Sequence, residues 1–509
     1  MADGNFVNHP MIKENLMQSR VYQEAILSTA IEKNTLCVIP TGLGKTSIAI
    51  LLAVQRIEKF PDSRIMVLAP TKPLVNQHIK TFKQFLNLDE NEFEVLTGII
   101  KPAKRKKLYR TRKMIFATPQ TVQNDLREEI FSLRDFSLLV IDEAHHAIGN
   151  YAYPYIVERY LEQAENQRIL GLTASPGGTR DKIMEIYRNL GMEAVEIKTE
   201  EDEDVSPWVK KKEVEWVSVE LPESFIRMKL MLVEVYEKNI RTLRKMRYVG
   251  RRKPTKRDLL AIQAGLHKNM KKDNKWAFLA ASYIAQAIKI EHAIGLLETQ
   301  GIHALENYWR KLREDKTKAA QKLLNNRNVS NAMFLTHELS ERGSRHPKMG
   351  KLCSIISQQM RKKPESKIIV FANFRDSVRE ISSILESIDG ARPVMLIGQK
   401  EGLSQKEQIE TIRQFEQDEY NTLVTTSIGE EGLHLSSADI AIFYEPVASE
   451  IRNIQRKGRV ARIKIGRIIF LMTMRTRDEA YYWTAHHKEK RMMKTLYDMK
   501  DGQKDLNYP

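Results

Sequence analysis

Two short stretches of this 509-residue sequence carry the residue types needed to bind and hydrolyse a nucleoside triphosphate. The first is the loop at residues 40–46, Pro-Thr-Gly-Leu-Gly-Lys-Thr, which follows the apolar run 36–39 and precedes a helical pattern. In a strand–loop–helix context, the backbone N–H groups of such a loop bind phosphates. We expect Lys45 to reach the β- and γ-phosphates and the Thr46 hydroxyl to ligate Mg²⁺. The candidate nucleotide-binding residues share this loop: Thr41, Gly42, Leu43, Gly44, Lys45 and Thr46.

The second stretch is Asp142-Glu143-Ala144-His145, directly after the apolar run 138–141. A carboxylate at the C-terminal end of a parallel strand lies on the rim where ligands bind in open sheets. We expect Asp142 to hold Mg²⁺ and Glu143 to polarise the water that attacks the γ-phosphate. His145 completes the stretch and is a further candidate catalytic residue.

The elements that must position these residues are short apolar runs alternating with longer helical patterns, which is typical of βαβ units in a parallel sheet. The first half of the chain has five such runs, at residues 36–39, 65–68, 114–116, 138–141 and 169–172. Five more follow later, at residues 367–371, 393–397, 422–425, 440–443 and 466–471. The sequence therefore predicts an α/β protein with two doubly wound parallel-sheet lobes.

Between the two sets of strands, residues 222–340 are rich in Lys, Arg, Glu, Ala and Leu and poor in Gly and Pro, which predicts long helices. We expect a first lobe at residues 1–205, an all-helical insertion domain at 206–345 and a second lobe at 346–509. The tryptophans of the insertion, Trp276 and Trp309, are expected in its core.

Composition favours a folded protein with a polyanionic partner. The chain has 82 Lys and Arg against 65 Asp and Glu, a formal charge of +17, which suits nucleic acid or, equally, simple solubility. Two cysteines cannot form a disulfide framework or a metal cluster. No leader or membrane-length apolar run is recognisable, so we expect a cytoplasmic protein, nuclear in a eukaryote, with no membrane partner.

Together these motifs resemble those of superfamily-two helicases and translocases of the DEAH-box type, which have two RecA-like lobes. The resemblance implies that Gln23 contacts the adenine of ATP and that residues 173–175, Thr-Ala-Ser, couple hydrolysis to lobe movement. It also implies nucleic-acid contacts at the family's strand-binding motifs, here Pro70, Thr71, Lys72, Gln77, Thr118, Pro119, Gln120 and Thr425.

In the second lobe, residues 455–462 resemble the arginine-bearing motif of this superfamily. The resemblance implies catalytic roles for Gln455, Arg459 and Arg462, the two arginines acting as fingers that stabilise charge on the transferring phosphoryl group. The family commonly has Asp where this sequence has His434, and Thr-Gly where it has Val460-Ala461.

The finer resemblance is to the family of the archaeal Hef helicase and the Fanconi anaemia group M translocase. It rests on the sequence of the loop at residues 40–46, the helical insertion, and the stretches at 346–349, 398–406 and 476–483. It implies an ATP-dependent helicase or translocase on forked or branched DNA in replication-fork repair and recombination, with no recognisable nuclease signature in this chain. Two alternatives stay open, a RIG-I- or Dicer-like translocase on double-stranded RNA and a non-catalytic nucleic-acid clamp.

Three basic runs, at residues 210–212, 251–253 and 271–272, suit a phosphate backbone or a solvated helix face. The sequence leaves translocation polarity, strand separation, oligomeric state and protein partners undetermined.

Overall fold

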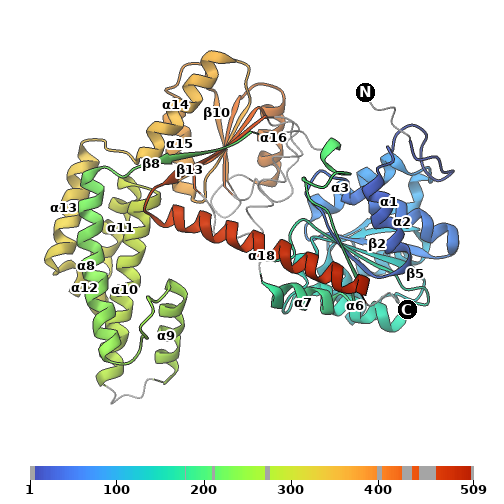
Figure 1. Ribbon diagram of the computed structural model, residues 1–509, viewed down its shortest axis with the longest axis horizontal. Helices are drawn as coiled ribbons and strands as arrows, with labels where there is room; N and C mark the ends of the chain where they lie inside the picture. Colours follow the sequence, from blue (N-terminus) through green and yellow to red (C-terminus); the bar gives the residue numbers. More distant parts are fainter. Residues whose placement is uncertain are drawn as a thin grey trace.

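The computed structural model describes residues 6–177, 179–208, 213–269, 275–397, 404–426, 438–445 and 466–505. These residues form two parallel sheets covered by helices and a separate bundle of helices (Figure 1). A long C-terminal helix, α18 (Arg477–Asp505), runs from the bundle and the second sheet to the first sheet (Figure 1).

The first sheet has the strand order β3-β4-β2-β5-β6-β1-β7, and its described pairs are parallel. Its strands are β1 (Thr35–Val38), β2 (Arg64–Leu68), β3 (Phe93–Leu96), β4 (Met114–Ala117), β5 (Phe136–Asp142), β6 (Ile169–Thr173) and β7 (Ala194–Ile197). Its helices are α1 (Val21–Glu32), α2 (Lys45–Lys59), α3 (Lys72–Phe85), α4 (Pro102–Thr111), α5 (Pro119–Arg127), α6 (Ala152–Gln163) and α7 (Arg180–Asn189).

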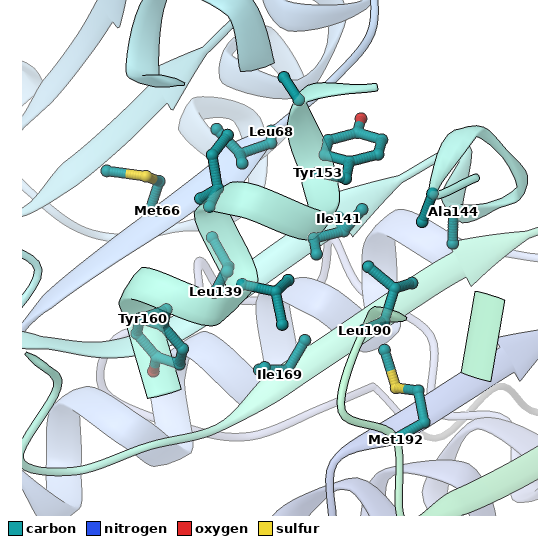
Figure 2. Packing of buried hydrophobic residues seen from close by; sticks show 14 of the residues in the cluster. Met66, Leu68, Leu139, Ile141, Ala144, Tyr153, Tyr160, Ile169, Leu190 and Met192 are labelled. Atoms are coloured by element: carbon teal, nitrogen blue, oxygen red, sulfur yellow. The ribbon is translucent and has the colours of Figure 1, made fainter. Parts of the chain in front are cut away.

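Helices cover both faces of this sheet, so its central strands are buried on both sides and consist of continuous apolar residues. In β5, Leu139 and Ile141 belong to the core on one face, whereas Leu138 and Val140 belong to the core on the other. Figure 2 shows the first of these faces, where the β5 side chains lie near Tyr153 of α6. This packing fixes β5 and therefore the carboxylates at its C-terminal end.

The second sheet has the strand order β10-β11-β9-β12-β13-β8, again with parallel described pairs. Its strands are β8 (Glu213–Val219), β9 (Ile368–Phe371), β10 (Pro393–Leu396), β11 (Thr422–Thr425), β12 (Ile440–Phe443) and β13 (Arg467–Thr473). Its helices within the described residues include α14 (Pro347–Lys362), α15 (Arg375–Leu385) and α16 (Gln405–Glu416). The predicted fold class, two doubly wound lobes with helices between them, is confirmed.

The ten predicted strands are present, and the three that the sequence did not predict, β3, β7 and β8, lie at sheet edges. Strand β8 falls inside residues 206–345, expected to be all-helical, yet it pairs with β13 over its whole length. Its residues Glu213 and Val214 are exposed, so it lacks the continuous apolar run of a central strand.

The helical bundle lies between the two sheets in sequence. Its helices are α8 (Glu223–Lys245), α9 (Lys256–Asn269), α10 (Lys275–Thr299), α11 (Ile302–Glu314), α12 (Lys318–Leu324) and α13 (Arg327–Glu341). Lys229 near the start of α8 pairs with Glu298 near the end of α10, so these two long helices are antiparallel (Figure 1). Trp309 is fully buried as expected, but the expectation for Trp276 is wrong, because its side chain is 69% exposed near the start of α10.

Helix α18 is anchored at both ends. Near its start, Asp478 forms a buried ion pair with Lys348 of α14, with 2.8 Å between Nζ and Oδ2. Further along, Met492 and Leu496 are buried in the core on one face of the first sheet. In the described parts of the chain, no helix combines the length and the apolar character needed to cross a membrane.

Candidate nucleotide and nucleic-acid site

The loop between β1 and α2 has the backbone conformation expected for binding phosphates. Gly42 and Gly44 have φ of 90° and 81°, in the left-handed region that favours glycine. Lys45 is buried, and its Nζ donates a hydrogen bond to the Ile39 carbonyl at 3.0 Å. The lysine therefore folds back over the loop that would surround the phosphates.

Gln23 lies against this loop. Its Nε2 donates to the Leu43 carbonyl at 3.1 Å, and the Tyr22 hydroxyl donates to the same oxygen at 2.7 Å. A Cβ on Gly44 would lie 2.2 Å from Gln23 Nε2, so a side chain at this position would displace the amide from the loop. The structure thus brings Gln23 to the loop, and its contact with the adenine of ATP stays a prediction.

Asp142 is the last residue of β5, and its side chain is nearly buried. Its Oδ2 lies 2.8 Å from Nε2 of His78, on helix α3. The Tyr153 hydroxyl of α6 donates to the Asp142 main-chain carbonyl at 2.7 Å. Two helices therefore hold this residue, one through its side chain and one through its backbone.

His145 connects the end of β5 with the end of β6. Its Nδ1 lies 3.3 Å from Thr173 Oγ1 and 3.4 Å from Glu143 Oε2. Burial lowers the pKa of His145 to about 3, and the neighbouring His146 contributes to this decrease. Ile39, whose carbonyl accepts the Lys45 hydrogen bond, donates its own N–H to the Thr173 carbonyl at 3.2 Å, so the phosphate loop and the Asp-Glu-Ala-His stretch meet at Thr173 in one cluster.

The donor atoms of this cluster suit Mg²⁺. Among the described residues no group of three or more His, Cys, Asp or Glu side chains can hold a metal ion. Mg²⁺ is commonly held by one or two carboxylates together with substrate phosphates and water, not by an all-protein cage. Asp142 and the Thr46 hydroxyl are a donor set of that kind.

Three helix N-termini follow the neighbouring strands β2, β3 and β4 of the same sheet. Each of these strands is followed by a helix with proline at its first or second position: α3, α4 and α5. No side-chain hydrogen bond caps any of the three, and helix N-termini of this kind bind anions. Thr71 Oγ1, at the start of α3, is buried with no hydrogen-bond partner among the described residues.

The other candidate nucleic-acid residues occupy varied positions. Lys72 and Gln120 are exposed at this edge, Pro70 and Gln77 are half-buried, and Pro119 is buried. Thr118 is half-buried, with its Oγ1 2.9 Å from that of Thr121.

Thr425 differs from the expectation of a nucleic-acid contact. It is fully buried and its hydroxyl donates to the Leu396 carbonyl at 3.0 Å, so its side chain holds the second sheet together.

Several features singled out from the sequence lie outside the described residues: Gln455, Arg459, Arg462, His434, Val460, Ala461, the basic runs 210–212 and 271–272, and residues 398–403. Two residues of the site have weak or no signal in the sequence. His78 follows Gln77 in a strand-binding motif, yet it contacts the metal-binding candidate, and Tyr153 belongs to no motif.

Comparison with protein families gives three matches in succession along the chain. A model of the DEAD/DEAH box helicase matches residues 19–183, and one of the helicase conserved C-terminal domain matches residues 347–464. Between them, residues 225–343 match a helical bundle provisionally ascribed to ATP-dependent RNA helicases.

The chain is similar to several proteins over nearly its whole length. It is 39% identical over 97% of its length to a protein of Methanocaldococcus jannaschii provisionally described as an ATP-dependent RNA helicase. It is 33% identical over 92% of its length to the ATP-dependent DNA helicase fml1 of Schizosaccharomyces pombe, and 30% identical over 94% to the Fanconi anemia group M protein homolog of Mus musculus. The chain spans 63%, 58% and 26% of these three relatives, respectively.

Among solved structures, the chain is similar to the helicase domain of Pyrococcus furiosus Hef, with 42% identity and a TM-score of 0.76. The match covers 93% of this chain and all of that domain. Since a domain of known structure is matched in full at this identity, the chain belongs to the Hef helicase family within the DEAD/DEAH box helicases.

Proposed function

We propose that this chain is an ATP-dependent DNA helicase or translocase, with ATP and Mg²⁺ bound at the end of β1, β5 and β6. One observation carries the proposal. Lys45, Asp142 and His145 form one cluster at an edge of the first sheet. The neighbouring strands β2, β3 and β4 are followed by three helices whose N-termini have no side-chain caps. In this proposal, the site that binds ATP and the surface that binds the nucleic-acid backbone lie on the same sheet.

In this proposal Lys45 and Thr46 bind the β- and γ-phosphates and the metal, while Asp142 completes the metal ligands. Mg²⁺ supplies charge neutralisation on the phosphates when bound. Glu143 accepts a proton from the attacking water and orients it. Arg459 and Arg462 are proposed as the cations that the second lobe supplies on closure.

The proposed track is DNA with a fork or branch. The S. pombe relative is named a DNA helicase. Residues 241–257 contain nine Lys and Arg and no Asp or Glu, and these cations are exposed except for Arg244, which is half-buried. They extend from the last residues of α8 to the start of α9, at the same end of the bundle as the exposed Trp276. Cations with an exposed aromatic ring suit phosphates and unpaired bases.

A second candidate track is double-stranded RNA, because the M. jannaschii relative and the helical-bundle family carry RNA helicase descriptions. The two tracks share the ATP chemistry and differ in which nucleic acid stimulates it. A non-catalytic clamp would bind nucleic acid without turnover.

The test is steady-state ATP hydrolysis with single-stranded, duplex, forked and four-way DNA and with duplex RNA, using the Lys45→Ala variant as the control. We expect forked and four-way DNA to stimulate turnover most. We expect Lys45→Ala to bind DNA normally without hydrolysing ATP, since Lys45 is proposed to bind the phosphates of ATP and not those of DNA. Strongest stimulation by duplex RNA would favour the second candidate. Binding without turnover in the wild-type protein would favour a clamp.

A further inference from the structure

His78 connects the two halves of the sheet edge. Its Nε2 lies 2.8 Å from Oδ2 of Asp142, and the two side chains are 8% and 10% exposed. An ionised carboxylate only accepts hydrogen bonds, so the imidazole donates its Nε2–H. Nδ1 of His78 is buried with no partner among the described residues. The hydrogen bond of this buried imidazole is therefore directed at the carboxylate proposed to hold Mg²⁺.

The helix that carries His78 begins at the proposed nucleic-acid surface. Thr71 is the N-cap of α3, and its own Oγ1 is buried without a partner in the described structure. His78 comes seven positions after Thr71, which is about 10 Å along a helix. An anion bound at the start of α3 would thus lie at one end of a two-turn segment. The Asp142 carboxylate lies at the other end, beside His78.

This segment is held as a rigid body. Leu74, Val75 and Phe82 of α3 are buried in the core on one face of the first sheet, together with residues of β2 and β4. Close-packed interiors do not deform continuously, so a displacement at one end of such a helix is felt along its length. The same core contains Leu138 and Val140 of β5, so α3 and the strand that carries Asp142 are packed together. A small shift of α3 against the sheet would therefore change the distance between His78 Nε2 and the Asp142 carboxylate.

We propose that His78 is a positioning residue that couples nucleic-acid binding at the start of α3 to the orientation of the Asp142 carboxylate. The inference rests on the proposed function, because it assumes a metal-bound nucleotide at Asp142 and a phosphate backbone at Thr71. Hydrogen bonds of this kind orient metal-ligating carboxylates, and losing one costs about 10- to 100-fold in metal affinity or activity.

The test compares His78→Gln with His78→Asn in the full chain. Both variants offer an amide N–H, but only the longer Gln side chain reaches as far as the imidazole Nε2. Binding of a fluorescent, non-hydrolysable ATP analogue is measured over a Mg²⁺ series, with and without a single-stranded DNA oligonucleotide. DNA affinity without nucleotide and thermal melting are measured in parallel. Gln84→Asn, at the exposed C-terminal end of α3, is the control for a change in the helix itself.

For His78→Asn we expect the Mg²⁺ concentration at half-saturation to rise about 10- to 100-fold, and the effect of DNA on analogue affinity to disappear. DNA affinity without nucleotide should stay within about twofold, because the start of α3 is unchanged. His78→Gln and Gln84→Asn should behave like the wild-type protein.

Two results would overturn the inference: wild-type Mg²⁺ and DNA dependence in His78→Asn, or equal impairment of both His78 variants with lowered melting temperatures, which would indicate a packing role. If analogue binding by the wild-type protein responds neither to Mg²⁺ nor to DNA, the proposed function itself fails, and the inference fails with it.

Discussion

Glu143 follows strand β5 with a backbone φ of 50°, a conformation that residues with side chains rarely adopt. Such strain costs of order 1–3 kcal/mol and persists only where the surrounding structure enforces it. Here the buried β5 precedes Glu143, and His145 contacts its carboxylate at 3.4 Å. The strained residue directly follows Asp142, at the position where Glu143 is proposed to orient water.

Replacing Glu143 by Gln should leave nucleotide and Mg²⁺ affinity nearly unchanged while slowing hydrolysis roughly 10²–10⁴-fold, since only the proton acceptor is removed. Single-turnover hydrolysis and equilibrium binding of ATP separate the two effects. Loss of ATP affinity in this variant, comparable to that in Lys45→Ala, would assign Glu143 to metal support instead.

His346 should make the stability of the protein fall at acidic pH. Its Nε2–H donates to the Glu298 carbonyl at 2.9 Å and its Nδ1 accepts the Lys348 N–H at 3.2 Å, so the buried ring is neutral. Burial, and then the charge of Lys348, hold the pKa of His346 well below its ordinary value of 6.5. The unfolded chain therefore takes up a proton near pH 6.5 that the folded protein excludes.

The contribution of His346 is complete above pH 6.5 and falls as pH decreases, by up to about 1.4 kcal/mol per pH unit. In His346→Asn, the helix cap can be kept but this titration is removed, so the loss of stability between about pH 8 and about pH 5.5 should be smaller than in wild type. Urea unfolding at both pH values measures the difference. An unchanged pH dependence would show that the folded protein binds this proton.

In the helical bundle, the end of α8 and the turn after it form a strongly basic stretch. The Arg244 guanidinium donates to the Gly250 and Arg251 carbonyls, which folds the turn back onto the end of α8. Arg251, Arg252 and Lys253 remain exposed on this turn. Like charges held this close are unfavourable without a polyanion, so the turn suits a phosphate backbone.

Changing Arg251, Arg252 and Lys253 together to Gln should weaken forked-DNA binding more than single-strand binding. The slope of affinity against salt should decrease by roughly one for each phosphate that the variant no longer neutralises. The triple variant of Arg310, Lys311 and Arg313, exposed cations on α11, removes the same charge and is the matched control. Affinities for forked and single-stranded DNA are measured across a salt series, and the control should not weaken binding of one DNA more than the other. Equal slopes for both triple variants would mean that the turn is a solvated surface.

Across the whole molecule, α18 is the element that joins parts distant in sequence. Its start is tied to the second lobe by the buried Lys348–Asp478 pair and to α10 by Arg477, whose Nη2 donates to the Glu291 carbonyl at 2.8 Å. Its later turns contact the first lobe, where Ser175 Oγ donates to the Met492 sulfur at 3.1 Å. The helix therefore links the second lobe to residues beside the nucleotide cluster (Figure 1).

Leu496→Asp should detach the end of α18 from the first lobe, because it places a charge in a fully buried apolar position. Lys494 is exposed on the same helix, so Lys494→Asp introduces the same residue at a position where it is not buried, and it serves as the control. We expect rapid proteolysis within α18 and a lower melting temperature for Leu496→Asp only. Equal protease resistance in the two variants would show that this packing does not hold the helix in solution.

The sequence alone predicted the nucleotide loop, the Asp-Glu-Ala-His stretch and the ten strands that carry continuous apolar runs. Nine of those strands lie inside the sheets, where burial on both faces selects apolar residues throughout. The tenth, β10, lies at an edge, and its exposed Met395 is apolar nonetheless. The loop and the carboxylates follow them directly, and a strand that ends at the sheet rim delivers its next residue to the ligand side. The order of residues along the chain was therefore sufficient to predict these strands, the loop and the carboxylates.

Only the tertiary structure decided which distant residues meet. The pairing of His78 with Asp142 joins positions 64 residues apart, and β8 joins β13 across the entire helical bundle. Edge strands such as β8 have exposed positions that interrupt the apolar run, and a tryptophan such as Trp276 has the same apolar character whether its helix face is covered or exposed. These outcomes depend on which surfaces pack together in three dimensions, and residue type and spacing do not encode that directly.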